Sequence, residues 1–252
     1  MKAILVLAGM ELRRMFVSPL AWSLLAVVQF ILAWVFLLGL SEYISLQPQF
    51  AGMEDPPGIS DLVVSALYLW AGIIMLAVMP LITMRQFAEE RMNQTLLLLT
   101  SAPISNTQIV LGKYFGVLAF VLLMVAMLTL MPLSLSMGTG LDWGKLVAAV
   151  LGLVLLLASF AAAGLFLSAL TRQPVIAAVL TFGFLLFLVV LYISGNSQGT
   201  GSEVLVYLSH FGHFLAFMEG LFDTRDVVYY ALFIGGFLIL TIRKLDDERL
   251  QG

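Results

Sequence analysis

The chain has two histidines, His210 and His213, which are three residues apart in an apolar stretch. On a helix this spacing places both imidazoles on one face, where they could bind one metal ion with help from Glu219 or Asp223. The alternative is an outer membrane interface, because imidazole is amphipathic and lies here among phenylalanines. The interface is the favoured interpretation, and the histidines stay as metal candidates only. The rings that would form a membrane anchor, a dimer contact or an exit gate are Phe211, Phe214 and Phe217.

A second group of polar residues lies in the stretch 85–113, RQFAEERMNQTLLLLTSAPISNTQIVLGK. Its first part is compatible with a helix, which the sequence Thr100–Pro103 ends, and Ser105 or Asn106 can cap the helix that follows. This pattern predicts a short helix, a turn and a helix whose charged tip a partner protein could bind, with Leu96–Leu99 anchoring the base. An ordinary solvated loop is the alternative. The charged residues of the tip are Glu89, Glu90 and Arg91.

The groups that catalysis or ion coupling would need are missing from the sequence. Lys113 and Lys145 follow glycines, but neither completes the G-x-x-x-x-G-K-[ST] pattern that cradles phosphate, so the chain itself is not expected to bind or hydrolyse ATP. The long apolar runs contain no Asp, Glu, Lys, Arg or His, whereas ion-coupled carriers keep such groups as relays. Ser159 and Thr181 have no histidine partner at depth and are expected to bond to helix carbonyls. These features argue against an enzyme and against an ion-coupled carrier.

The composition identifies lipid as the solvent of most of the chain. Of its 252 residues 62% are hydrophobic and 11% are charged, and the mean hydropathy is +1.07, whereas soluble domains carry about 25% charged residues. Cysteine is absent, which excludes disulfides and thiolate metal sites. Runs of about 20 apolar residues can cross a hydrocarbon core as helices, so we predict an all-α membrane protein with six transmembrane helices in one domain, residues 1–252. The runs are Leu20–Leu40, Leu62–Met84, Tyr114–Met137, Leu146–Thr171, Pro174–Ser194 and Val227–Ile242.

The lysines and arginines predict the orientation of these spans. If the N-terminus is cytoplasmic, ten of the 12 basic residues fall in inside segments, and Lys145 and Arg225 alone fall outside. Both termini are therefore expected in the cytoplasm. The first run is too long for a signal-peptide core and no small-x-small site follows it, so it is expected to stay as a span.

Two further segments are expected to lie at the membrane faces. Residues 1–17 are compatible with a helix, carry basic residues, and are separated from the first span by Ser18 and Pro19, which predicts a helix along the cytoplasmic face. The alternative is a cytoplasmic extension of the first span. Residues 202–222 contain a 15-residue apolar run, Val204–Met218, which we interpret as re-entrant or interfacial, because a seventh crossing would place the C-terminal basic residues outside.

Small residues in the later spans allow helices to approach closely. They form two groups, Ala161–Gly164 and Gly235–Gly236. Packing within the chain is expected for both, with packing across a dimer as the alternative.

The polar stretch between the second and third spans resembles the signature of ABC transporter type-2 permeases. The resemblance lies in residues 88–105, AEERMNQTLLLLTSAPIS, and 108–114, QIVLGKY, and it extends to residues 11–19, ELRRMFVSP, and to the six-span layout. Within that family the sequence is most similar to the gliding-motility GldF-like subfamily. Two positions depart from the pattern, because Gln94 replaces the usual Gly and Leu97 replaces a frequent Glu.

The resemblance implies specific roles for the segments described above. Residues 1–17 would be an amphipathic elbow helix, 85–113 would contain a coupling helix held in a groove of an ATPase subunit, and 202–222 would be a re-entrant pair before the last span. The chain itself would have no catalytic residue and no cofactor, since the ATPase would bind ATP and magnesium. The residues implied in ATPase docking are Glu89, Glu90, Arg91, Asn93 and Thr95.

The function expected from this resemblance is that of the permease subunit of an ATP-driven exporter in a bacterial inner membrane. Its partners would be the ATPase, a second permease copy or a paralogue, the bilayer, and in some systems a periplasmic accessory protein, with no nucleic acid. The alternative is a scaffold of the same fold that transmits ATP-driven conformational change to periplasmic proteins without moving a substrate. Nothing in the sequence indicates the substrate.

Overall fold

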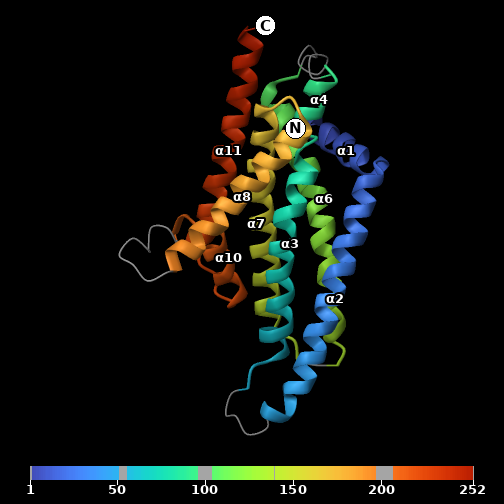
Figure 1. Ribbon diagram of the computed structural model, residues 1–252, viewed down its shortest axis with the longest axis vertical. Helices are drawn as coiled ribbons and strands as arrows, with labels where there is room; N and C mark the ends of the chain where they lie inside the picture. The colour runs from blue at the N-terminus through green and yellow to red at the C-terminus, as the bar shows by residue number, and fades with distance from the viewer. Residues whose placement is uncertain (1, 51–55, 96–103, 139, 197–206, 252) are drawn as a thin grey trace.

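Helices account for all regular structure in the residues that the computed structural model describes, which are 2–50, 56–95, 104–138, 140–196 and 207–251 (Figure 1). Apolar runs in lipid form helices because each backbone N–H then finds its carbonyl partner within the same segment. In chain order the helices are α1 (Lys2–Val17), α2 (Pro19–Phe50), the π-helical turn η1 (Ser60–Val64), α3 (Ser65–Thr83), α4 (Ala88–Met92), α6 (Asn106–Leu135), α7 (Trp143–Leu170), α8 (Pro174–Asn196), α10 (His210–Met218) and α11 (Thr224–Gln251).

Six helical segments are long and apolar enough to cross a membrane, so the predicted all-α fold with six spans is confirmed. Most of them extend past the apolar runs, and α2, for example, continues from the predicted limit at Leu40 to Phe50. Within the described residues no seventh segment qualifies, and α10 is short. The six segments are Pro19–Phe50, Ser60–Met92, Asn106–Leu135, Trp143–Leu170, Pro174–Gly195 and Thr224–Arg249.

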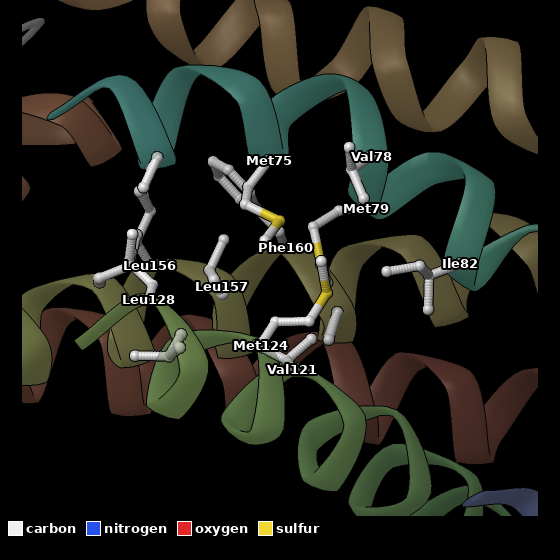
Figure 2. Close-up of a cluster of buried hydrophobic side chains, with 14 of the residues drawn as sticks. Met75, Val78, Met79, Ile82, Val121, Met124, Leu128, Leu156, Leu157 and Phe160 are labelled. Carbon is white, nitrogen blue, oxygen red and sulfur yellow. The ribbon is translucent and has the colours of Figure 1, made fainter. Parts of the chain in front are cut away.

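The core of the bundle lies between α3, α6 and α7. In the most apolar stretch of α7, 72% of the residues are buried, against 22% in each of α2, α8 and α11, which therefore lie at the periphery. Methionines from α3 and α6 meet leucines of α7 in this core, because the flexible thioether chain fills irregular gaps between helices. The side chains shown in Figure 2 include Met75, Met79, Met124, Leu156, Leu157 and Phe160.

Small residues of α7 bring neighbouring helices close to its backbone. Ala161, Ala162 and Ala163 are fully buried, and a Cβ added at Gly164 would collide with Thr83 of α3. The prediction of packing within the chain is correct for this group. It is wrong for Gly235–Gly236, where an added Cβ would meet no atom within 4 Å, because this face of α11 lies on the surface of the bundle.

Both chain termini lie at the same end of the bundle as α1 and α4, and we call it the terminal end (Figure 1). There α1 lies across the bundle instead of along it, and the chain turns at Ser18 before α2 begins at Pro19. Proline favours such a break because its ring restricts the residue before it and removes an N–H donor. The predicted N-terminal helix and its break are thus confirmed, and its contact with a membrane surface stays a prediction.

Candidate functional site

The start of α4 is held by one hydroxyl group of the central helix. Ser168 Oγ of α7 accepts hydrogen bonds from the backbone N–H groups of Phe87 and Ala88, each at 3.1 Å, and donates to Met84 O at 2.9 Å. Phe87 and Ala88 are fully buried. The turn between α3 and α4 is therefore fixed to the core, although α4 itself has only five residues.

The end of α4 is a left-handed turn closed by two backbone hydrogen bonds. Thr95 N–H donates to Glu90 O at 2.9 Å and Gln94 N–H donates to Arg91 O at 3.2 Å, which is the Schellman pattern. Gln94 has φ 56°, a conformation that costs about 1–2 kcal/mol for a residue with a Cβ. Gln94 stands where the resembled family usually has glycine, so the turn that glycine favours is retained here without glycine.

A buried ionic cluster joins α4 to α1 and α6. Lys113 Nζ of α6 donates to Glu11 Oε1 of α1 at 2.6 Å and to Glu90 Oε1 of α4 at 2.5 Å. Arg14 Nη1 contacts the same Glu90 oxygen at 3.0 Å and lies 3.6 Å from Glu11 Oε2. Only 2% of the Lys113 side chain is exposed. We call these four residues the Lys113 cluster, in which two cations balance two carboxylates.

Glycines of α6 allow α1 to approach closely enough to complete this cluster. A Cβ at Gly112 would lie 2.5 Å from Leu7 Cβ, and one at Gly116 would lie 2.7 Å from Glu11 Cβ. Their G-x-x-x-G spacing is the pattern that lets membrane helices pack backbone to backbone. The role of Glu11 was not predicted from the sequence, but this spacing around Lys113 could have indicated a helix contact.

The last turns of α11 are bonded to α4 and to the first residue of α6. Arg91 Nη2 pairs with Glu248 Oε2 at 2.8 Å, and Asn106 Nδ2 donates to Asp246 Oδ1 at 2.7 Å. Only 12% of the Arg91 side chain is exposed. Since α11 projects past α4 at the terminal end (Figure 1), both elements are available to a partner that approaches from there.

The five residues implied in ATPase docking divide between two sides of α4. Glu90 and Arg91 point inward and form ion pairs within the chain, whereas Asn93 and Thr95 are exposed and Glu89 is about one-third exposed. Ser105 forms the predicted cap of α6, because its Oγ accepts from Gln108 N–H at 3.3 Å. The predicted anchor and break, Leu96–Leu99 and Thr100–Pro103, lie outside the described residues.

His213 uses both ring nitrogens in hydrogen bonds. Its Nδ1 lies 2.6 Å from Asp226 Oδ1, and its Nε2 lies 2.8 Å from the carbonyl oxygen of Tyr207. The structure thus places Asp226 beside the histidine, where Glu219 or Asp223 was expected. Across the described ranges no three His, Asp or Glu residues are placed to hold a metal ion.

His210 is buried against rings of other helices. Its Nδ1 lies 2.9 Å from the Tyr229 hydroxyl, its ring stacks on Phe160, and its Nε2 is buried without a partner in the described part of the chain. Burial lowers the pKa of His210 to about 3, so its imidazole is neutral near pH 7.

The histidines and phenylalanines of this segment do not form the predicted lipid-facing anchor or dimer contact, because they are buried among the chain's own helices, whereas their position at the outer membrane interface and their role as an exit gate stay predictions. Both imidazoles are buried within the chain, and Phe214 and Phe217 are fully buried because Gly72 and Gly152 leave space for their rings. Since lipid and a protein interior are both apolar, aromatic residues alone do not distinguish the two environments.

Six spans with short connecting segments and a polar cluster at one end define a multi-pass membrane protein. Compared with protein families, residues 5–200 match the model of the ABC-2 family transporter protein, and the chain therefore belongs to this family. It is a permease, the membrane subunit of an ABC transporter; members work with an ABC ATPase subunit and are not themselves catalytic. No curated protein matches the chain, and the GldF-like subfamily stays a prediction.

Proposed function

We propose that this permease belongs to an ATP-driven exporter of a bacterial inner membrane and that α4 is its coupling helix. The observation that carries the proposal is the Lys113 cluster, in which Glu90 of α4 shares one ammonium group with Glu11 of α1. A displacement of α4 therefore acts directly on α1 and on the membrane helix α6. The export direction follows from the resemblance to type-2 exporters.

The two sides of α4 have different tasks in this mechanism. Glu89, Asn93 and Thr95 form the exposed side and would contact the ATPase, which binds ATP and magnesium. Glu90 and Arg91 form the inward side, and they pass the movement to α6 and, through Glu248, to α11. Because packed interfaces shift between discrete arrangements, a push on α4 would tilt these helices and open a route between two permease copies or paralogues.

The distribution of charge supports a cytoplasmic location for the terminal end. Ten of the 12 lysines and arginines belong to segments on that side of the predicted spans. The ATPase would need ATP from the cytoplasm, so α4 and the C-terminal turns of α11 would face it there.

To test the docking role, tagged permease is purified from native membranes. The measured quantity is the amount of ABC ATPase, identified by its P-loop sequence, that co-purifies with it. The triple variant E89A/N93A/T95A should recover much less ATPase than the parent chain, since it removes the exposed polar groups of α4. The matched control is E42A/S45A/S136A, which removes exposed polar groups from the opposite end. Equal recovery of the ATPase with both triple variants would show that the exposed side of α4 is not the docking surface.

A further inference from the structure

A cavity of about 330 Å³ lies where α1 joins α2, beside the end of α3 and the side of α6. Its apolar wall would accept hydrocarbon, whereas its polar wall carries two guanidinium groups, a carboxylate, a hydroxyl and an amide. The apolar wall includes Leu20, Ala21, Leu24, Leu81, Ile82 and Phe120, and the polar wall is Arg14, Ser18, Arg85, Gln86 and Glu89.

The guanidinium groups at the polar wall are partly accessible, although Arg14 already donates to Glu90 Oε1 and to Arg85 O. The exposed fraction of the side chain is 43% for Arg14 and 40% for Arg85. Arg85 Nε lies 3.9 Å from Glu89 Oε2, which is too far for a hydrogen bond. Arginine is suited to phosphate because its planar group presents several N–H donors at once. Because Arg14 is already balanced within the Lys113 cluster, the wall keeps one further cation, Arg85, and one carboxylate, Glu89, which match the opposite charges of a zwitterionic head group.

Gln86, which also lines the cavity, carries an unsatisfied acceptor. Its side chain is 2% exposed, and its Oε1 has no hydrogen-bond partner in the described structure. A buried acceptor without a donor is unfavourable, and native structures contain few of them. A ligand that carries an N–H or O–H donor beside its phosphate would satisfy it.

The cavity lies at the level where membrane head groups are expected. It is bounded by the first turn of α2 and the last turn of α3, where the apolar spans give way to Arg85 and Glu89. Trp22, on the same turn of α2, is 60% exposed and donates from Nε1 to Phe16 O at 2.8 Å. An exposed tryptophan at the end of a span is typical of the membrane interface.

We propose that this cavity binds one phospholipid of the phosphatidylethanolamine type. Its phosphate would lie against Arg85 and Arg14, its ammonium group would donate to Gln86 Oε1 beside Glu89, and its acyl chains would follow α2 and α3. Phosphatidylcholine has the same charge but no N–H donor, so it would leave Gln86 unsatisfied. The assignment to the cytoplasmic leaflet rests on the proposed orientation, whereas the binding itself does not depend on ATPase docking.

The proposal is tested by native mass spectrometry of the purified chain with added phosphatidylethanolamine, phosphatidylcholine or phosphatidylglycerol. The parent chain should retain phosphatidylethanolamine about tenfold to a hundredfold better than phosphatidylcholine, as expected for one additional hydrogen bond to a charged group. R85Q should reduce retention of both lipids, and Q86L should remove the preference between them. R172Q, an exposed arginine in the turn between α7 and α8, is the matched control and should retain the preference.

Equal retention of the ethanolamine and choline lipids by the parent chain would overturn the proposal without any variant. Stronger retention of phosphatidylglycerol would also overturn it, because net charge would then decide binding in place of the ammonium donor. ATPase recovery is measured on the same R85Q sample. Lipid retention and ATPase recovery can change independently, so a failure of the lipid proposal is distinguishable from a failure of the docking proposal.

Discussion

Lys113 lies among apolar side chains at a depth where an isolated ammonium group would be unstable. Taking a charge out of water is unfavourable by several kcal/mol unless partners surround it. Here Glu11 and Glu90 supply two carboxylate oxygens within 2.6 Å, and the Phe87 ring centroid lies 5.3 Å from Nζ. The stability of this end of the protein therefore depends on the balance of the four charges.

The first prediction concerns this balance. Lys113→Met should destabilise the chain by about 3–5 kcal/mol, because it leaves two buried carboxylates without their shared cation. Thermal unfolding in detergent measures the effect as a lower midpoint. The triple variant K113M/E11Q/E90Q removes three of the four charges and leaves only Arg14, which is 43% exposed, so it should recover much of the loss. A triple variant as unstable as K113M would contradict this account.

The sequence predicted Glu90 as a site residue but did not predict that its side chain points into the protein. A helix of five residues has too few turns for periodicity to distinguish an inward from an outward face. The partners of Glu90 are also distant in the chain, since Lys113 follows it by 23 positions and Glu11 precedes Lys113 by 102. Local patterns could therefore predict a charged tip, but not which of its charges are paired within the chain.

At the scale of the elements, the contact between α1 and α6 shows how two glycines determine the place of a helix. Gly112 and Gly116 leave no room for a Cβ, so α1 lies directly on the backbone of α6. A larger side chain there would separate the helices and withdraw Glu11 from Lys113.

The second prediction follows from this contact. Gly116→Leu should release α1, because its side chain would collide with Glu11 Cβ and Ala8 O. Hydrogen exchange of residues 2–17 should then become faster, and proteases should cleave α1 more readily. Gly183→Leu on α8 is the matched control, since a Cβ there meets no atom within 4 Å. Unchanged exchange of α1 in G116L would show that the contact does not fix this helix.

The spans were predictable from the sequence because apolar length alone decides them. The surroundings of α10 were not predictable, since hydropathy is the same for a ring in lipid and for one packed on Gly152. Gly235 and Gly236 have no close neighbour, because small residues permit close helix packing but do not require it.

At the scale of the whole molecule, the positions of basic residues predict which end faces the cytoplasm. The chain contains no cysteine, so single cysteines can report this directly. Suitable positions are Met137 in the turn after α6, which is 94% exposed, and Met92 on α4, which is 56% exposed. The end of α6 and the short helix α4 lie at opposite ends of the bundle (Figure 1).

The third prediction is that a membrane-impermeant maleimide labels Met137→Cys on intact spheroplasts. Met92→Cys should be labelled only after the membrane is opened, because α4 would face the cytoplasm. The cysteine-free parent chain is the control for background labelling. Labelling of Met92→Cys before opening, with Met137→Cys protected, would reverse the proposed orientation.

The distance along the chain between Glu11 and its partner also has a consequence for biosynthesis. Lys113 is translated 102 residues after Glu11, when α2 and α3 have already been synthesised. Until α6 enters the membrane, the Glu11 carboxylate has no buried cation to join, and it stays in contact with water and head groups. The first helix to be made is therefore among the last to reach its final position, and a nascent chain that ends after α3 contains an undocked N-terminus.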